Sequence, residues 1–291
     1  MTEWTGVRAK RVLITGATRG IGLAGAEALA RRGAQVAIVA RNDARADDAV
    51  RRIEAAGGSK VDVLHADLRS LGSVRALAAD ALGRYPHIEV LINNAGAWFK
   101  DRAVTADGIE QTWALNHVAP FLLTTLLLDR LKTSAPARII TTTSDAHKGK
   151  LIPFDDLNAE RSYRSRGWTR YGETKLANIL FTLELSRRLE GTGVTAYCFH
   201  PGLVATGFNH NNGVLMSTAM AIIRPFSRNP KKGAQTMVWL ADSADVSKQS
   251  GGYYLDRALG VPSRPAQDPE VARRLWEVSE EQVGSASAVH A

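Results

Sequence analysis

Residues 12–22 read VLITGATRGIG, and this stretch decides the fold. A short apolar run leads directly into a turn that carries Gly16, Gly20 and Gly22, and a helical pattern follows from Leu23. Glycines between a buried strand and a helix let the backbone approach a pyrophosphate closely, while the helix N-terminus offers free N–H groups and a partial positive charge. The stretch therefore predicts a phosphate-binding turn at the first strand-to-helix junction of a βαβ pattern.

Further short apolar runs recur along the chain, and most of them precede a longer helical pattern. The predicted strands are Val12–Thr15, Val36–Ala40, Val61–His65, Val90–Ile92, Arg138–Thr143 and Val194–Phe199. The helical ranges include Leu23–Arg32, Leu71–Leu82, Gly108–Arg130, Trp168–Glu190 and Lys232–Leu240, with Gly33 and Gly191 as C-terminal caps. Continuous apolar strands that alternate with helices indicate a parallel sheet covered on both faces. The predicted fold is α/β, a doubly wound Rossmann domain.

The chain has 291 residues, and one large α/β sheet can absorb that length without a second domain. We therefore expect a single domain over residues 1–291, with a cofactor-binding and catalytic core at 8–206. Residues 207–230 begin with an Asn-rich run and continue with Met and Ile residues, which is typical of a substrate lid with an apolar inner face. Residues 231–291 are expected to hold a C-terminal helix, the last strand and a tail.

Hydrophobic residues make up 45% of the chain and charged residues 23%, which is ordinary for a globular protein and excludes a disordered or fibrous class. The formal net charge is +8, but the basic residues are scattered in pairs such as Arg31-Arg32 and Arg187-Arg188 and form no basic arm. Dispersed charge mainly affects solubility and the steering of anionic ligands. We therefore expect no nucleic-acid partner.

Cysteine usage and the N-terminus bear on the compartment. Cys198 is the single cysteine and lies in an apolar stretch, so a buried packing role in a reducing compartment is expected. Residues 1–16 contain no apolar run ahead of the first strand, and we expect neither a signal peptide nor a membrane anchor there. These observations predict a cytoplasmic protein.

The end of the second predicted strand indicates which dinucleotide is bound. An acidic residue there accepts hydrogen bonds from a ribose 2′-hydroxyl, whereas a basic residue pairs with a 2′-phosphate. Val36–Ala40 ends in Arg41, and Arg19 precedes the second glycine of the turn. Guanidinium groups match phosphate geometry well, so the pair favours NADP(H). NAD stays the alternative because Asp43 is near and both arginines are also compatible with a solvated surface.

Tyr171 and Lys175 are the candidates for acid–base chemistry. They are four positions apart in a helical stretch, which puts both side chains on one face. A free tyrosine has a pKa of about 10, and a nearby ammonium is expected to lower that pKa and so to favour proton exchange near neutrality. Ser144 lies just past a predicted strand, at the sheet edge where open α/β sheets bind ligands, so its hydroxyl can hold a substrate oxygen.

From these motifs the sequence resembles the short-chain dehydrogenase/reductase superfamily along nearly its whole length. The glycine spacing is Gly-x-x-x-Gly-x-Gly, and the other motifs follow in family order. They are Asp67-Leu68, NNAG at Asn93–Gly96, Asn116, Ser144, YGETK at Tyr171–Lys175, and Pro201-Gly202. The resemblance implies hydride transfer between a nicotinamide dinucleotide and a carbonyl or alcohol.

The resemblance also implies roles for individual residues. The implied catalytic set is Asn116, Ser144, Tyr171 and Lys175, with Asn116 holding a water that links to Lys175. The implied cofactor contacts are Gly16, Thr18, Arg19, Gly20, Ile21, Gly22, Arg41, Asp67, Leu68, Asn93, Ala95, Gly96, Tyr171, Lys175, Pro201, Gly202, Val204 and Thr206. Within that set, Asp67 is expected at the adenine edge, Asn93 on the adenosine side, and Thr206 at the nicotinamide carboxamide or phosphate.

Residues 141–160, TTTSDAHKGKLIPFDDLNAE, are similar to the retinol dehydrogenase-like branch, as are residues 175–206 and the C-terminal ARRLWEVSEE. This likeness implies a lipophilic carbonyl or alcohol substrate. We expect no N-terminal membrane anchor of the kind that the animal retinol enzymes carry, so retinol itself is not expected. Thr143 stands where relatives often carry a serine, and Ser144 is kept.

Three further readings stay open or are set aside. A catalytically silent dinucleotide sensor is the alternative function, although such a protein need not keep Asn116, Ser144, Tyr171 and Lys175. The histidines are not at metal-ligand spacing, so no metal is expected. The long helices around Asn116 and Tyr171 predict a homo-oligomer, and specifically a dimer. Apolar residues on the second helix fit either a core or that interface; they are Leu176, Ile179, Leu180 and Leu183.

Overall fold

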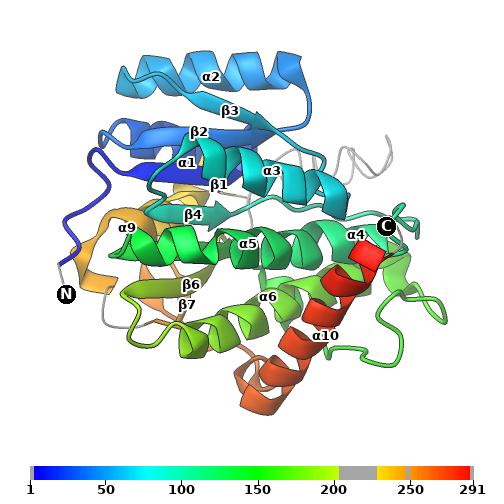
Figure 1. The fold of residues 1–291 in the computed structure, drawn as a ribbon. Coiled ribbons are helices and arrows are strands. Elements are labelled where there is room, and N and C mark those ends of the chain that lie inside the picture. The colour runs from blue at the N-terminus through cyan, green and yellow to red at the C-terminus, as the bar shows by residue number, and fades with distance from the viewer. Residues whose placement is uncertain (1–2, 203–227, 247–249, 289–291) are drawn as a thin grey trace.

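The sheet confirms the predicted α/β class. The computed structural model describes residues 3–202, 228–246 and 250–288, and within them eight strands follow the order β3-β2-β1-β4-β5-β6-β7-β8. The strands are β1 (Arg11–Thr15), β2 (Gln35–Ala40), β3 (Asp62–His65), β4 (Val90–Asn93), β5 (Ala137–Thr142), β6 (Val194–His200), β7 (Tyr253–Leu255) and β8 (Ala258–Leu259) (Figure 1). All neighbouring strands pair in parallel except β7 with β8, so the last strand departs from the expected parallel sheet.

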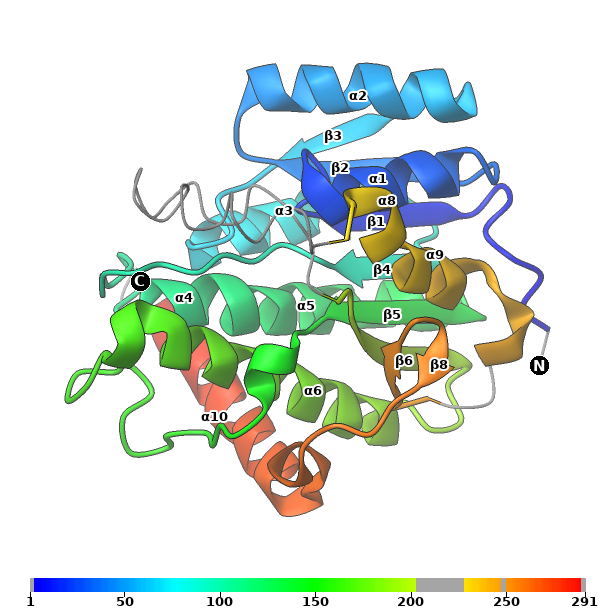
Figure 2. The ribbon, with the colours of Figure 1, turned by 180° about the vertical axis from the view of Figure 1, so that it is seen from behind.

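Helices cover both faces of the sheet (Figures 1 and 2). One face carries α1 (Gly20–Ala30), α2 (Asp43–Gly57), α8 (Pro230–Gly233) and α9 (Gln235–Asp242); the other carries α3 (Leu71–Arg84), α5 (Ala119–Thr133), α6 (Trp168–Arg188) and α10 (Pro269–Ala288). Side chains alternate across a strand. Leu13 therefore joins the core under α3, α5 and α6, while Val12 and Ile14 join the core under α1 and α9. Helix α2 lies outside the helical ranges predicted above.

The glycine turn lies where the strand order reverses. β1 pairs with β2 on one side and with β4 on the other, and ligands bind at such switch points in open α/β sheets. Gly16 has a φ of 67°, and a Cβ there would lie 2.8 Å from the Ala95 Cα. A Cβ on Gly22 would lie 2.2 Å from the Gly16 carbonyl oxygen. Only glycine fits these two positions without moving the backbone.

The helix predicted over Gly108–Arg130 is divided in the structure. Gly108 is left-handed, with a φ of 76°, and lies in a turn. Helix α4 (Gln111–Trp113) then begins because the Glu110 carboxylate accepts the backbone N–H groups of Thr112 and Trp113. A π-helical turn at Ala114–Val118 connects α4 to α5. Such turns insert one residue into a helix and often occur at functional sites.

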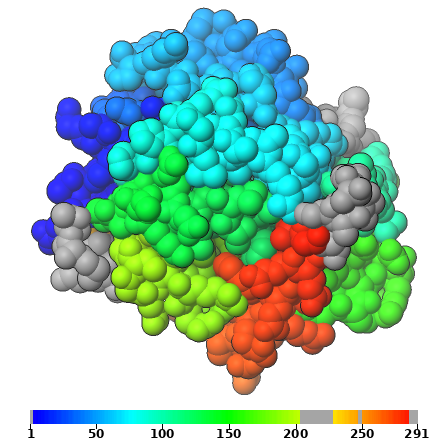
Figure 3. Space-filling model, in the orientation of Figure 1, coloured from blue at the N-terminus to red at the C-terminus, as the bar shows by residue number. Residues whose placement is uncertain are grey.

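Helix α10 packs against α6 and covers its outer face (Figure 3). Trp276 stacks on Phe181, with ring centroids 5.8 Å apart, and meets the Phe121 ring edge-on at 4.9 Å. Leu176 and Leu180 are completely buried within the single chain, so they belong to its core. The dimer stays a prediction. Of the helices that the structure describes, none has the length and apolarity needed to cross a bilayer.

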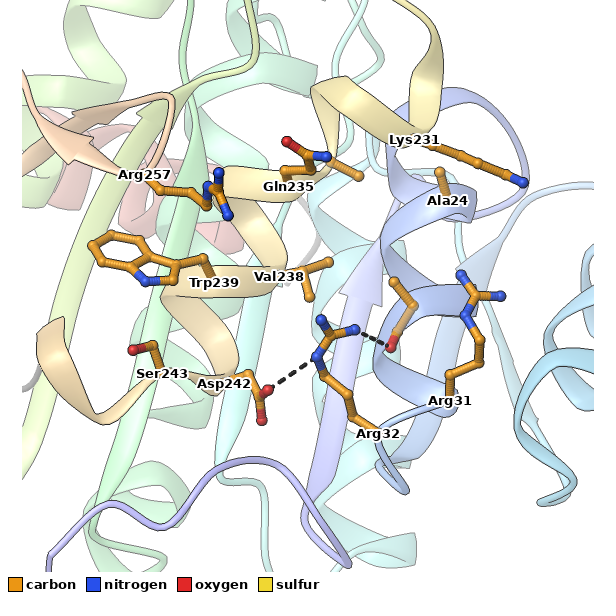
Figure 4. A pocket seen from close by; sticks show the side chains of 12 residues that line it. Ala24, Arg31, Arg32, Lys231, Gln235, Val238, Trp239, Asp242, Ser243 and Arg257 are labelled. Atoms are coloured by element: carbon orange, nitrogen blue, oxygen red, sulfur yellow. Dashed lines mark hydrogen bonds and ion pairs between the residues drawn. The ribbon is translucent and has the colours of Figure 1, made fainter.

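A cavity of about 480 Å³ lies between α1 and α9 (Figure 4). Its lining includes Arg31, Trp239 and Arg257, together with an ion pair in which Arg32 Nε lies 3.0 Å from Asp242 Oδ2. None of the predicted site residues lines this cavity. This cavity therefore lies away from the carboxyl edge of the sheet, where the predicted site residues gather.

The packing of α10 predicts the effect of Trp276→Ala. Removing a buried indole should lower the free energy of unfolding by about 3–5 kcal/mol, because its burial is lost and a cavity is left between three rings. Urea denaturation of the purified protein measures this loss. The matched control is Arg273→Ala on the same helix, whose solvent-exposed ion pairs should contribute little to the free energy of unfolding. An equal effect of both substitutions would show that α10 is not docked as described.

Candidate active site

The start of α1 is suited to a bound diphosphate. Arg19 is the N-cap residue and supplies no side-chain hydrogen bond to the first turn. The first N–H groups of a helix have no partner within the helix, so they are available to an anion. Gly20 has a φ of 60° and Gly16 one of 67°, and together they bend the backbone around this end of the helix. Thr18 is half-buried in the same turn, and Ile21 packs against the core.

Asn94 ties this turn to two other strands. Its Nδ2 donates to the carbonyl oxygens of Thr15 and Gly16, both at 3.1 Å, and its Oδ1 accepts from Thr142 Oγ1 at 3.2 Å. Thr15 Oγ1 in turn accepts from the backbone N–H groups of Asn94 and Ala95 at 3.0 Å. Asn94 was not among the predicted site residues. Its position inside the NNAG motif was the available signal.

Three arginines gather beside the glycine turn. Burial lowers the pKa of Arg19, and the nearby charges of Arg45 and Arg41 lower it further. Like charges held this close favour an anionic ligand that separates them. Arg41 and Arg19 were predicted, whereas Arg45 was missed because its helix, α2, was not among the expected helices. The cluster is therefore suited to an anionic group.

Asp67 lies at the end of β3 and is engaged by a neighbouring arginine. Its Oδ2 lies 2.7 Å from Arg69 Nη2 and 4.0 Å from Arg41 Nη1. The hydrogen bond from Arg69 holds the pKa of this carboxyl below its usual value. The charged side chain is half-buried beside the arginine cluster, and Leu68 packs against the core next to it. A contact with an adenine edge stays a prediction.

Tyr171 and Ser144 come together at the carboxyl edge of the sheet. Tyr171 lies in the first turn of α6, and Ser144 follows β5 at the N-cap of a short 3₁₀ turn, where its Oγ accepts from Ala146 N at 3.2 Å. The two hydroxyls share a hydrogen bond. Lys175 lies one turn along α6, and its Nζ donates to the Thr142 carbonyl oxygen at 3.1 Å. The predicted catalytic serine, tyrosine and lysine are thus adjacent.

The expected effect of Lys175 on Tyr171 is wrong in this structure. The Lys175 Nζ lies 5.5 Å from the centroid of the Tyr171 ring. Burial raises the pKa of Tyr171, and the hydrogen bond with Ser144 offsets only part of that rise. Burial also lowers the pKa of Lys175 to about 8. Both shifts have one cause, since a low-dielectric environment disfavours a phenolate and an ammonium alike.

Asn116 lies in the π-helical turn and reaches both neighbouring segments. Its Oδ1 accepts from Ala97 N at 2.9 Å, and its Nδ2 donates to the Ala97 carbonyl at 2.9 Å and to Thr174 Oγ1 at 3.0 Å. A Cβ on Gly96 would lie 3.2 Å from Asn116 Oδ1 and 3.3 Å from Lys175 Nζ. Gly96 therefore lets Asn116 and Lys175 approach one another. The bridging water stays a prediction.

The remaining predicted residues have different surroundings. Asn93 is buried on the α5 side of the sheet, where its Nδ2 donates to Thr124 Oγ1 at 2.9 Å. It lines a small pocket with Leu68 and Ala95, two other predicted cofactor contacts, and its own contact with a cofactor stays a prediction. Thr143 donates its hydroxyl to the Phe199 carbonyl at 3.0 Å. Pro201 and Gly202 follow β6 at that edge. Val204, Thr206 and residues 207–227 lie outside the described residues.

A buried ionic network supports the catalytic edge. Arg170, beside Tyr171, pairs its Nε with Glu110 Oε2 at 2.9 Å, and the two side chains are 2% and 0% exposed. Glu110 also accepts the N–H groups of Thr112 and Trp113 at 2.8 and 3.0 Å. The pair thus links the start of α6 to the helix that leads into the π-helical turn. Among the described residues, no three His, Cys, Asp or Glu side chains converge on a metal site.

Comparisons with known proteins identify the family of this chain. The family model described as short chain dehydrogenase matches residues 10–214. Mouse retinol dehydrogenase 14 is 43% identical over 289 residues, which cover 94% of this chain and 86% of that protein. A Streptomyces sp. (strain C5) protein named as a daunorubicin C-13 ketoreductase is 41% identical, and the match covers 97% of this chain and 96% of that protein.

Solved structures show the same fold. A crystal structure of a protein from Mycobacterium paratuberculosis is 33% identical, with a TM-score of 0.77, and covers 97% of this chain and 98% of its own. A short chain dehydrogenase from Burkholderia cenocepacia J2315, solved in complex with NADP, is 26% identical with a TM-score of 0.68. That match covers 86% of this chain and 96% of the other.

The ionic network predicts the behaviour of Glu110→Gln. The substitution should lower the free energy of unfolding by about 1–3 kcal/mol, because the Arg170 guanidinium loses one of its two carboxylate partners and keeps only Glu173 at 3.2 Å. In an Arg170→Met background, Glu110→Gln should leave the free energy of unfolding unchanged or raise it, because no buried guanidinium is then present to lose a partner. Urea denaturation of the two single variants and the double variant measures this cycle. Equal losses in both backgrounds would contradict the described pair.

Proposed function

Because this chain belongs to the short chain dehydrogenase family and is an NAD(P)-dependent oxidoreductase acting on CH–OH or carbonyl groups, we propose that it moves hydride between NADP(H) and a lipophilic carbonyl or alcohol. One observation carries the proposal. Ser144, Tyr171 and Lys175 meet at the carboxyl edge of the sheet, on the edge that also holds the glycine turn and three arginines.

The proposed mechanism assigns each group one task. The bound nicotinamide supplies or accepts the hydride. In the reducing direction, the Tyr171 hydroxyl donates its proton to the carbonyl oxygen, while the Ser144 hydroxyl donates a hydrogen bond to that oxygen. Lys175 keeps a proton close to the Tyr171 ring, and its pKa of about 8 suits exchange near neutrality. Asn116 keeps the π-helical turn against α6 through Thr174.

The arginine cluster supports NADP(H) over NAD(H). Arg19, Arg41 and Arg45 repel one another, so an added 2′-phosphate would relieve that repulsion. A ribose without the 2′-phosphate would leave the repulsion among the three arginines unchanged. The Burkholderia relative was solved with NADP, which supports a nicotinamide dinucleotide at this edge. Val204 and Thr206 complete the proposed cofactor contacts.

The substrate side of the proposal rests on the relatives and on the sequence. Relatives named for retinol and for daunorubicin support a lipophilic substrate. Residues 207–230 are the proposed lid, within a single domain whose core spans 8–206. The sensor alternative has no support among the comparisons, which match dehydrogenases and ketoreductases, and the chain keeps the complete proton-transfer set.

Cofactor kinetics test this proposal. With a lipophilic aldehyde such as decanal, Arg41→Ser should lower kcat/KM for NADPH by about tenfold, the effect of one charge-assisted contact at an exposed site. The value for NADH should change less than about twofold, since the lost contact is to the 2′-phosphate. Absorbance of the reduced cofactor measures both values.

The control for this test is Arg31→Ser, which carries a similar change at the remote cavity between α1 and α9. It should leave both cofactor values unchanged. If Arg41→Ser lowers the values for NADPH and NADH equally, the arginine cluster does not select the phosphate. If the unaltered protein oxidises neither cofactor with any of a broad panel of lipophilic aldehydes and ketones, the proposed reaction itself is wrong.

A further inference from the structure

Three aromatic rings lie in contact at the catalytic edge. Trp168 stacks on Tyr171 with ring centroids 5.3 Å apart and planes 29° apart. Trp98, in the loop after β4, meets Trp168 edge-on at 5.3 Å and 73°. Offset-stacked and edge-on arrangements of this kind are the favourable ones for aromatic pairs. The catalytic tyrosine is therefore one member of a built cluster, and Trp168 is the middle ring.

The backbone before Trp168 is built to present it. Ser165, Arg166 and Gly167 are all left-handed, with φ values of 53°, 49° and 74°. Two consecutive non-glycine residues in this region are strained, and such strain persists where surrounding contacts hold it, which is often at functional sites. A Cβ on Gly167 would lie 2.0 Å from the Phe99 carbonyl oxygen.

Side chains from the neighbouring loop hold that strained segment. Trp98 Nε1 donates to the Arg166 carbonyl oxygen at 2.8 Å. Tyr163 Oη donates to the Phe99 carbonyl oxygen at 2.8 Å, so the segment is fixed at both ends to the loop that follows β4. Trp168 is thus positioned from two elements, α6 and the β4 loop. Its placement does not depend on helix propensity alone.

Exposure distinguishes the middle ring from its neighbours. Trp168 is 42% exposed, whereas Tyr171 is 7% and Trp98 is 8% exposed. An exposed indole contributes less hydrophobic stabilisation than a buried one. Packing in this cluster buries Tyr171 and Trp98 but leaves Trp168 partly exposed. This partly exposed ring stacks on Tyr171, whose hydroxyl would protonate a substrate. A group attached to the carbonyl carbon would come within reach of it.

We propose that Trp168 forms an aromatic wall of the substrate site and selects carbonyl compounds that carry a flat aromatic group on the carbonyl carbon. This inference rests on the proposed function and names the substrate class of the same site. An aryl ring bonded to the carbonyl can lie against the indole while its oxygen reaches Tyr171. A puckered saturated ring of equal carbon number offers no flat surface and gains less from this contact.

The surrounding charges favour a neutral ligand over a cationic one. An exposed indole also attracts cations, but Arg164 and Arg166 precede Trp168 within four residues. Lys150 packs against the first turn of α6, since a Cβ on Gly172 would lie 2.8 Å from its Cε. These three positive charges repel an ammonium-bearing substrate. The aromatic wall is therefore assigned to a neutral aryl aldehyde or ketone.

A matched pair of aldehydes tests the inference. Benzaldehyde and cyclohexanecarbaldehyde share a carbon skeleton and differ in aromaticity. Their intrinsic reactivities also differ, but this difference cancels when the ratio of their kcat/KM values is compared between variants, so the change in that ratio isolates the contact with the flat ring. Trp168→Leu should lower the benzaldehyde to cyclohexanecarbaldehyde ratio about two- to tenfold, the worth of one aromatic contact. Trp168→Phe keeps an aromatic ring and should hold the ratio within about twofold. Trp239→Leu makes the same change at the remote cavity and should leave it unchanged.

The outcomes separate this inference from the proposed function. If Trp168→Leu turns over both aldehydes with an unaltered ratio, the aromatic wall is wrong and the reaction stands. If the unaltered protein turns over neither aldehyde, calorimetric titration of benzyl alcohol and cyclohexylmethanol into the protein with NADP⁺ decides the inference alone. Tighter binding of benzyl alcohol that Trp168→Leu abolishes supports it, and equal binding of the two alcohols overturns it.

Discussion

The site depends on one contact above all, the Asn94 side chain that joins three strands at their carboxyl ends. The side-chain amide of Asn94 forms hydrogen bonds with Thr15, Gly16 and Thr142. A single residue therefore connects the end of β4 to the glycine turn and to β5, the strand that leads to Ser144. The carbonyl of Thr142 then accepts from Lys175. The glycine turn and helix α6 are therefore both connected to the Asn94 side chain, α6 through Thr142. A displacement of Asn94 would move both halves of the site relative to each other.

Burial of Tyr171 and Lys175 is the second constraint, because a charged side chain is destabilised where water is excluded. Tyr171 and Lys175 are both nearly inaccessible, and burial shifts their pKa values in opposite directions, each toward the neutral form. The surrounding structure must hold them without relaxing. The buried pair of Glu110 and Arg170 and the bonds of Asn116 provide that support from the α4 side. Rigid support of this kind fixes reacting groups before a substrate arrives.

The sequence predicted the first six strands and the glycine turn because these depend on local patterns, whereas the short β7 and β8 were not predicted by range. Apolar runs of strand length predict strands, and glycines at a strand-to-helix junction predict a tight turn, without any knowledge of the tertiary contacts. The π-helical turn at Ala114–Val118 was not predictable, since its residues read as ordinary helix and the extra residue is set by contacts with Ala97 and Thr174. Arg45 shows the same limit. Its helix, α2, was not among the predicted helices, so no local pattern placed this arginine beside Arg19 and Arg41.

The central claim is that Tyr171 is the proton donor of a pre-assembled site, and single-turnover kinetics of Tyr171→Phe test it most directly. Mixing the NADPH complex with a lipophilic aldehyde should give oxidation about 10²–10⁴-fold slower than in the unaltered protein, the usual worth of a general acid. The dissociation constant for NADPH, measured by fluorescence titration, should change less than about threefold, since the ring and its packing are kept. A variant that oxidises NADPH at nearly the unaltered rate would contradict the account.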